Sequence, residues 1–229
     1  MARHIGIVAC SAEGAALCYR TICTEAPERM GEHTHPEITM HTFPLAEYMR
    51  HIRPGHWAEV GEMILRSAQK LAGCGAELLV CPDNTIHQAY ELIKDRLPMP
   101  WVHIAEAVRD EAWRHGYSHL GLLGTKYIMT GPVYAGVLEG AGVRCTAPAG
   151  KDQEEINRII FAELVNGIFT EGTRLFFNEV IGRLKAQGCD AVVLGCTEIP
   201  LIVDQDDCPL PALDSTRLLA RAAISRALA

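Results

Sequence analysis

The chain has 229 residues, of which 48% are hydrophobic and 21% charged, and its formal net charge at pH 7 is −7. That length and apolar content suffice for one large α/β domain or two small ones. The charge is spread along the chain without a run of Lys or Arg, which argues against a nucleic-acid partner. No stretch approaches the roughly 18 consecutive apolar residues of a membrane helix, and the first residues lack the apolar region of a signal peptide. The sequence therefore predicts a soluble, cytoplasmic protein.

Four short apolar runs, at 4–9, 76–81, 119–124 and 190–195, predict the strands of parallel sheets. Each run is nearly continuous, as expected of a strand buried on both faces, and each leads into a turn. Helical spacing of apolar residues between the runs predicts helices over 58–72, 157–166 and 176–186. Alternating strands and helices indicate the α/β class, with parallel sheets flanked by helices.

The two halves of the chain resemble each other. Residues 75–85 align without a gap with 188–198, and residues 6–11 align with 121–126 at a nearly equal offset. The alternative is a chance match, because all strand–helix units share an apolar run followed by glycine. A duplication predicts two pseudo-symmetric α/β domains, one formed by 1–100 with 210–229 and the other by 101–209.

A duplication also predicts where the chemistry lies. Parallel sheets bind ligands beyond the carboxyl ends of their strands. Two facing halves would present Asp83 and Cys196 from equivalent strand ends across one cleft. Inversion of a stereocentre needs two proton-transfer groups on opposite faces of one carbon, so the pair suits that chemistry.

Cys196 is the candidate reactive thiol among nine cysteines. The odd count and irregular spacing argue against a disulfide framework, and most of these thiols are expected to be small buried hydrophobes. Cys196 differs because it follows an apolar strand at Gly195 and precedes Thr197 and Glu198. Hydroxyl and backbone N–H donors at such a turn can favour the thiolate. The alternative is a buried structural thiol.

Asp83, Asn84 and Thr85 occupy the equivalent place in the first half. Pro-Asp-Asn is typical of a turn, and Asp or Thr can cap a helix beginning near Ile86. A cap that presents N–H groups is also a cradle for a carboxylate. Thr125 and Lys126, after Gly124, are either a plain loop or a ligand contact.

Other chemistry finds little support in the sequence. His33 and His35 have a metal-like spacing but no third and fourth ligand, which favours a solvated loop. No glycine-rich phosphate loop is present. Three candidate cations, Arg50, Arg53 and Lys126, either bind a side-chain carboxylate or lie in solvent.

Asn84-Thr85-x-His87 and Gly195-Cys196-Thr197-Glu198-Ile199, each ending an apolar strand, resemble the motifs of the aspartate/glutamate racemase family. The resemblance spans nearly the whole chain. It implies two α/β domains with a cleft between them, a homodimer, a small amino-acid or carboxylate substrate, and neither pyridoxal phosphate nor metal as cofactor. The residues it implies for substrate binding or for shaping the pocket are Ser11, Asn84, Thr85, Thr125, Lys126, Thr197 and Glu198.

Asp83 departs from the family pattern, which has cysteine immediately before Asn-Thr. A carboxyl group has a reference pKa of about 3.9 against about 8.5 for a thiol, so Asp83 is the weaker base. If ionised, it would also repel a dicarboxylate substrate, so either the substrate is not ordinary aspartate or Asp83 is held neutral. The leading interpretation is an amino-acid racemase in which Cys196 and Asp83 are the two acid–base groups. The alternatives are a one-thiol isomerase or decarboxylase of a diacid on the same scaffold, and a non-catalytic amino-acid-binding protein.

Overall fold

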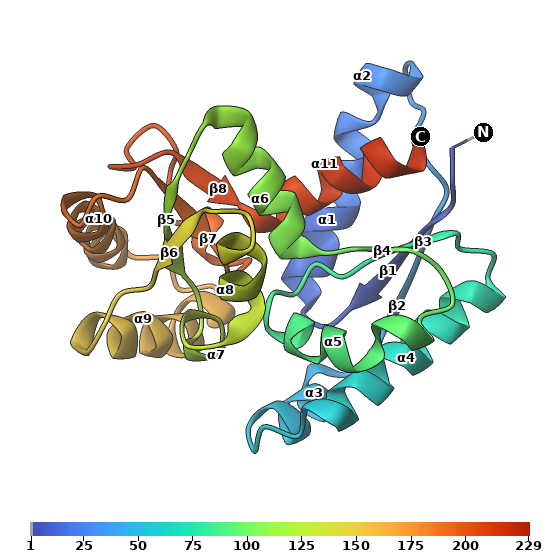
Figure 1. The fold of residues 1–229 in the computed structure, drawn as a ribbon, viewed down its shortest axis with the longest axis horizontal. Helices are drawn as coiled ribbons and strands as arrows, with labels where there is room; N and C mark the ends of the chain where they lie inside the picture. The colour runs from blue at the N-terminus through green and yellow to red at the C-terminus, as the bar shows by residue number, and fades with distance from the viewer. Residues whose placement is uncertain (1) are drawn as a thin grey trace. The chain divides into compact units, whose positions relative to one another are not determined.

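A computed structural model of the chain describes residues 2–229. The chain forms two compact units: one extends to Ala107 and includes Thr216–Ala229, and the other is Val108–Ser215. Each unit contains one four-stranded parallel sheet flanked by helices (Figure 1), which confirms the predicted α/β class. Across residues 2–229, no helix is both long enough and apolar enough to traverse a bilayer.

The sheet of the first unit has the strand order β2-β1-β3-β4. Its strands are β1 (Ile5–Ala9), β2 (Ile38–Thr42), β3 (Leu78–Val80) and β4 (Trp101–Val102). Its helical segments are α1 (Ala12–Glu25), α2 (Pro27–Met30), α3 (Leu45–Ile52), α4 (Trp57–Gly73), η1 (Thr85–Ala89), α5 (Tyr90–Ile93) and η2 (Lys94–Arg96). Helix α6 (Ile104–His115) leads into the second unit, and α11 (Ser215–Ala227) returns to the first.

The sheet of the second unit has the corresponding order, β6-β5-β7-β8. Its strands are β5 (His119–Leu123), β6 (Arg144–Thr146), β7 (Ala191–Leu194) and β8 (Ala212–Asp214). Its helical segments are α7 (Lys126–Met129), α8 (Pro132–Glu139), α9 (Lys151–Ala162), η3 (Leu164–Asn166), α10 (Glu171–Ala186) and η4 (Ile199–Leu201).

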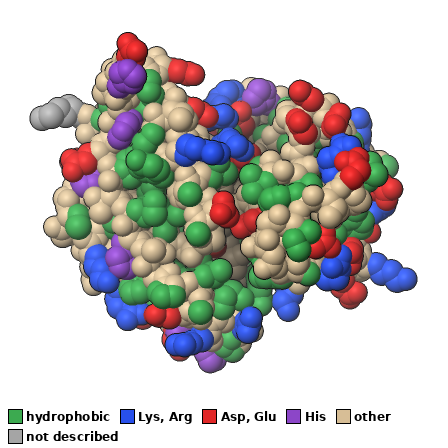
Figure 2. Space-filling view, turned by 180° about the vertical axis from the view of Figure 1, so that it is seen from behind, with side chains coloured by type: hydrophobic (Ala, Val, Ile, Leu, Met, Phe, Trp, Pro, Cys, Tyr) green, Lys and Arg blue, Asp and Glu red, His purple; other side chains and the backbone are tan. Residues whose placement is uncertain are grey.

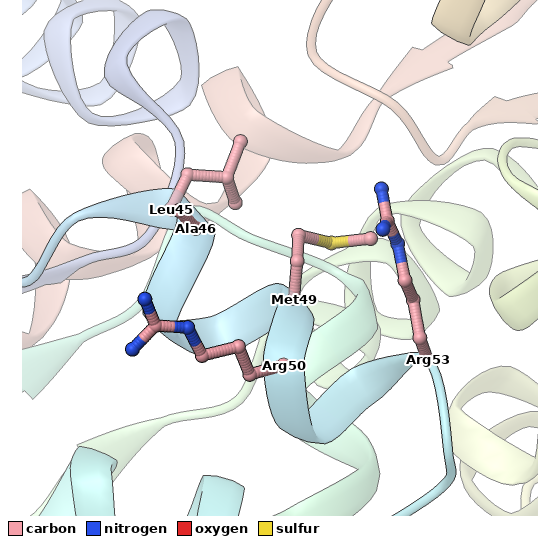
Figure 3. A pocket seen from close by; sticks show the side chains of 5 residues that line it. All are labelled: Leu45, Ala46, Met49, Arg50 and Arg53. Atoms are coloured by element: carbon pink, nitrogen blue, oxygen red, sulfur yellow. The ribbon is translucent and has the colours of Figure 1, made fainter.

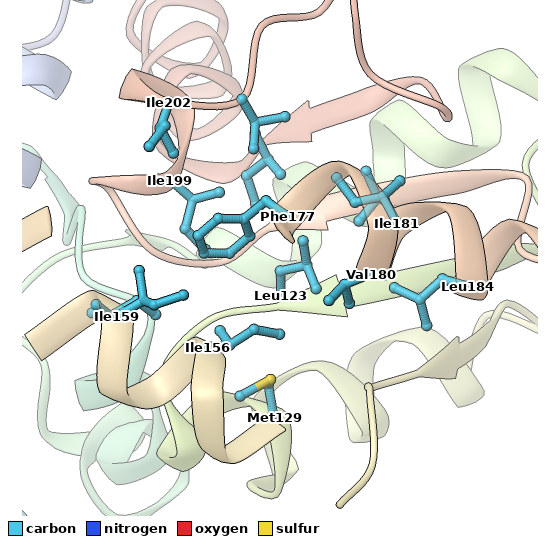
Figure 4. Packing of buried hydrophobic residues seen from close by; sticks show 14 of the residues in the cluster. Leu123, Met129, Ile156, Ile159, Phe177, Val180, Ile181, Leu184, Ile199 and Ile202 are labelled. Carbon is cyan, nitrogen blue, oxygen red and sulfur yellow. The ribbon is translucent and has the colours of Figure 1, made fainter. Parts of the chain in front are cut away.

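The core of the second unit lies where α9 and α10 pack against the sheet. Ile156 and Ile159 of α9 and Phe177 of α10 are almost fully buried and meet Leu123 of β5 (Figure 4). Burial of each such side chain contributes roughly 1.5–3 kcal/mol. This cluster also includes Ile199 of η4, so the turn that follows β7 is anchored in the core.

The helix predicted over 157–166 is displaced in the structure. Helix α9 begins at Lys151 and ends at Ala162, and η3 follows after a break. The break falls at Glu163, whose carboxylate accepts hydrogen bonds from Arg158 and Thr173. The prediction was wrong there because apolar spacing marks only the buried face and does not register polar contacts that end a helix. The helix predicted over 176–186 begins earlier, at Glu171, where Thr170 caps it.

Matching polar contacts in the two units support the predicted internal duplication. The ring of His4 lies 2.9 Å, Nε2 to Oγ1, from Thr39 in the first unit. In the second unit the ring of His119 lies 2.7 Å, Nε2 to Oγ1, from Thr146. In each unit the bond joins the start of the central strand to the neighbouring edge strand, and the strand orders agree. A chance likeness between strand–helix units does not require the same side chains at the same places.

Candidate active site

Gly195 sets the position of the Cys196 turn in the second unit. Its N–H donates to the carbonyl oxygen of Leu123 at 2.7 Å, so the chain beyond β7 stays against β5. A Cβ at Gly195 would lie 2.8 Å from that same oxygen, closer than carbon and oxygen can approach. The close approach therefore requires glycine and holds the next residue at the carboxyl end of β7.

Cys196, Thr197 and Glu198 form one hydrogen-bonded group. The Cys196 thiol donates to Glu198 Oε2 at 3.0 Å, and the Thr197 hydroxyl donates to the same oxygen at 2.8 Å. Thr197 and Glu198 are buried, whereas Cys196 is half-buried. The Thr197 hydroxyl, expected to favour a thiolate, is directed to the carboxylate because one oxygen accepts both donors. The thiol thus faces a group that can take its proton.

Thr125 and Lys126 lie at the start of α7, also in the second unit. The Lys126 N–H donates to Asn157 Oδ1 at 2.9 Å, which fixes the loop to α9. The exposed Lys126 side chain lies over the Tyr127 ring, with Nζ 5.3 Å from the centroid. The backbone and the side chain of Lys126 thus both make contacts within the second unit.

In the first unit, Asp83 follows β3 and is half-buried. Its Oδ1 accepts a hydrogen bond from the Ile86 N–H at 3.1 Å, which confirms the predicted cap near Ile86. Asn84 beside it is buried and Thr85 half-buried, so all three predicted residues lie together at the end of one strand.

His87 holds this turn from behind. Its Nε2 accepts hydrogen bonds from the Trp101 indole and the Ile104 N–H, both at 3.3 Å, so the ring proton is on Nδ1. Nδ1 then donates to the Asp83 carbonyl oxygen at 2.7 Å. Burial, reinforced by the nearby His103, holds the pKa of His87 well below its ordinary value of 6.5. The ring is therefore a neutral structural link.

Three weak acids, Cys10, Cys81 and Tyr48, surround Asp83; the family resemblance implied only that the turn near Cys10 helps to shape the pocket, and it gave no role to Tyr48. The thiol of Cys10, which follows β1, hydrogen-bonds to the Asp83 side chain. Cys81 Sγ lies 3.9 Å from the Asp83 carbonyl oxygen. Tyr48 of α3 interacts electrostatically with Cys10, Cys81 and Asp83. Burial is the main cause that raises the pKa of each of these three groups. The sequence did contain a signal for Cys10: like Cys196, it comes at the end of an apolar strand.

Ser11 has a structural task at the neighbouring strand end. Its hydroxyl oxygen accepts the Gly14 N–H at 3.3 Å and caps α1. Residues 2–229 contain no cluster of three or more His, Cys, Asp or Glu side chains placed to hold a metal ion.

A shallow depression of about 360 Å³ lies on the outer face of α3. It is lined by Leu45, Ala46, Met49, Arg50 and Arg53, and Figure 3 shows the Arg53 side chain beside Met49 while Arg50 points away from them. Elsewhere on the surface, basic and acidic side chains are interspersed over the face drawn in Figure 2. Arg50 and Arg53, two of the candidate cations, thus line this depression with exposed side chains that point in different directions.

Comparison with known proteins gives one consistent result. The sequence model described as Asp/Glu/Hydantoin racemase matches residues 5–223. The broad specificity amino-acid racemase RacX of Bacillus subtilis (strain 168) is 27% identical over 85% of this chain and 83% of its own length.

Solved structures agree with that match. A Yersinia pestis protein solved as a candidate Asp/Glu racemase is 32% identical, with a TM-score of 0.92 over 99% of this chain and 100% of that one. PH1733 of Pyrococcus horikoshii OT3, an aspartate racemase homologue, is 28% identical, with a TM-score of 0.87 over 99% and 100% of the two chains.

Proposed function

Because this chain belongs to the Asp/Glu/hydantoin racemase family, we propose that it racemises an amino acid without a cofactor, using Cys196 and Asp83 as its two acid–base groups. The observation that carries the proposal is the contact of the Cys196 thiol with the Glu198 carboxylate, at 3.0 Å. A thiol at a strand end beside a buried proton acceptor can exist as thiol or thiolate, and racemisation requires both forms.

The protonation pattern suits one direction of the reaction. In that direction Asp83 starts as a carboxylate and Cys196 as a thiol, forms with which the acceptor contact of Asp83 and the donor contact of Cys196 are compatible. Asp83 then takes the α-proton: the Cα–H bond breaks, an O–H bond forms, and the electron pair passes into the substrate carboxylate. Cys196 gives its proton to the opposite face of Cα and becomes a thiolate. The forward reaction leaves Asp83 protonated and Cys196 as a thiolate. The other enantiomer reacts by the reverse sequence from that form: the Cys196 thiolate takes the α-proton and Asp83 gives its proton to the opposite face of Cα.

Carboxylate recognition is assigned to the residues around each acid–base group. Asn84 and Thr85 lie beside Asp83, and Thr197 lies beside Cys196. An ionised Asp83 repels a second carboxylate at close range, so we expect amino acids with uncharged side chains to be better substrates than aspartate. Broad specificity in the related Bacillus subtilis protein supports testing a wide panel.

The direct test incubates single enantiomers of the protein amino acids with the enzyme in deuterated water. We expect at least one to lose optical activity while it takes up deuterium at Cα. The Cys196→Ser variant should lose both signals but keep ligand-induced thermal stabilisation. Deuterium uptake with retained optical activity would favour a one-sided reaction, and stabilisation without any turnover would favour a binding protein.

We also propose that the protein is a cytoplasmic homodimer, as the family resemblance implies. Light scattering coupled to size-exclusion chromatography should then give twice the chain mass of 25.1 kDa. A mass of one chain at working concentration would contradict the dimer and leave the proposed reaction standing.

A further inference from the structure

Each unit pairs one thiol with one carboxylate at the carboxyl ends of its strands. In the second unit the pair is Cys196 and Glu198. In the first unit, the Cys10 thiol hydrogen-bonds to the Asp83 side chain, although the two residues follow different strands, β1 and β3. Because β1 and β3 are adjacent and parallel, their carboxyl ends bring these residues together.

Burial distinguishes the roles within the first pair. Cys10 is only 4% exposed, while Asp83 is half-buried and lies in the outer position. A substrate can therefore contact the Asp83 carboxylate, whereas the Cys10 thiol can act on the substrate only through Asp83. Burial and the charge of Asp83 both raise the pKa of Cys10, so its proton stays in place as a hydrogen-bond donor.

The Tyr48 hydroxyl is a second, independent indication that the surroundings of Asp83 can stabilise negative charge. Tyr48 is fully buried, and its hydroxyl has no hydrogen-bond partner within residues 2–229. It belongs to α3, which follows β2, and it interacts electrostatically with Cys10, Cys81 and Asp83 and, in the opposite sense, with Arg66. A buried unsatisfied hydroxyl is disfavoured unless an acceptor reaches it. A donor is thus held ready beside Asp83.

We propose that Cys10 is a positioning residue for Asp83, and that the two form the acid–base unit of the first half of the chain as Cys196 and Glu198 do in the second. The inference rests on the proposed racemisation. When Asp83 is ionised, the Cys10 S–H bond donates to it and fixes its orientation. When Asp83 has taken the α-proton, the S–H bond remains intact, so Cys10 neither gains nor loses a proton in the cycle.

The test compares Cys10→Ala with Cys10→Ser and with Cys18→Ala. Cys18 is a fully buried thiol of α1 in the apolar core of the same unit and serves as the matched control. We expect Cys10→Ala to lower kcat about 10-fold or more, and Cys10→Ser, which keeps a donor, to recover much of the loss. The assay uses the fastest amino acid of the panel, deuterated at Cα, as each enantiomer.

A structural defect alone would slow both directions without changing the isotope effects selectively. The proposal instead predicts a larger deuterium isotope effect on kcat/KM for Cys10→Ala only in the direction in which Asp83 removes the proton. Rates and isotope effects equal to those of Cys18→Ala would overturn it, and so would a Cys10→Ser variant as impaired as Cys10→Ala.

Infrared spectroscopy tests the contact without relying on turnover. The S–H stretching band that disappears in Cys10→Ser belongs to Cys10. Asp83→Asn should move that band to higher frequency, because a neutral amide oxygen is the weaker acceptor. An unmoved band would refute the pairing even if racemisation is observed. A moved band with no racemisation of any amino acid would keep the pairing and reject the proposed function.

Discussion

Glu198 places a single carboxylate oxygen within hydrogen-bond reach of both the Cys196 thiol and the Thr197 hydroxyl. It has little contact with solvent, at 6% exposed. A buried carboxylate with two donors on one oxygen has a fixed orientation. That orientation is what a group needs if it is to receive the thiol proton.

Glu198→Gln keeps the size of the side chain but removes its charge and basicity. We expect kcat to fall by about 10²-fold or more, with a smaller change in KM, because the thiolate forms less readily. We also expect the alkaline side of the pH–rate profile to carry more of the remaining activity. Initial rates across a pH series measure both, and an unchanged profile would contradict a role in deprotonating Cys196.

His87 makes stability depend on pH. Its pKa in the folded protein lies well below 6.5, mainly because of burial. At mildly acidic pH the imidazole is therefore protonated in the unfolded chain but neutral in the folded protein. Stability should therefore decline as the pH falls below the ordinary histidine value, by at most about 1.4 kcal/mol per pH unit from this residue.

Urea unfolding of His87→Gln tests this dependence. The variant should be less stable near neutral pH, since it loses hydrogen bonds to a buried ring, but its stability should decline less on acidification. His33→Gln is the matched control, because His33 is exposed at 90%. An equal acid slope in His87→Gln and the unsubstituted protein would refute the link.

At the scale of elements, four central strands were readable from the sequence and four edge strands were not. The buried runs that became β1, β3, β5 and β7 are nearly all apolar, and their limits are within two residues of those predicted. The edge strand β2 has the sequence Ile-Thr-Met-His-Thr, and β4 has only two residues. Edge strands are paired on one side only, so little apolar patterning is imposed on them.

The candidate site likewise contains residues that the sequence could predict and contacts that it could not. Asp83 and Cys196 each follow a readable strand, so their positions could be predicted. The contact of Cys10 with Asp83 depends on the lateral order of β1 and β3, and Tyr48 reaches the same place from α3. Neither lateral order nor the inward direction of one helical residue is encoded in a local pattern.

Gly195→Ala tests how the end of β7 positions the thiol. The new Cβ would meet the Leu123 carbonyl at 2.8 Å and Ile128 Cγ2 at 3.2 Å. We expect a loss of about 1–3 kcal/mol in the free energy of unfolding, together with lower kcat. Gly182→Ala is the control, because nothing lies within 4 Å of its Cβ position in α10. It should raise helix stability by roughly 0.5–1 kcal/mol, and equal effects of the two variants would contradict the close approach.

At the scale of the whole molecule, the first unit depends on two distant parts of the chain. Leu219 and Ala223 of α11 are fully buried in its apolar core, and Arg221 forms an ion pair with Glu25 of α1 at 2.7 Å. The sequence predicted that 210–229 belong with the N-terminal half, and in the structure the segment in that unit is Thr216–Ala229. Helix α11 is thus part of the apolar core of the first unit.

Leu219→Ala should lower the free energy of unfolding by about 2–5 kcal/mol through the cavity it leaves. Arg226→Ala, on the exposed side of the same helix, should change it by less than about 0.5 kcal/mol. Chemical denaturation monitored by circular dichroism compares the two. Similar losses in both would mean that α11 is not part of the core.

The place of α11 in the chain also determines the order in which the protein can fold during its synthesis. Val108–Ser215 is continuous, so the ribosome delivers every part of that unit before it delivers the helix that completes the other. The earlier segments β1 and α1 therefore keep part of their apolar surface uncovered until α11 has been made. Because exposed apolar surface favours aggregation, we expect chaperones to bind the first unit of the nascent chain during that interval.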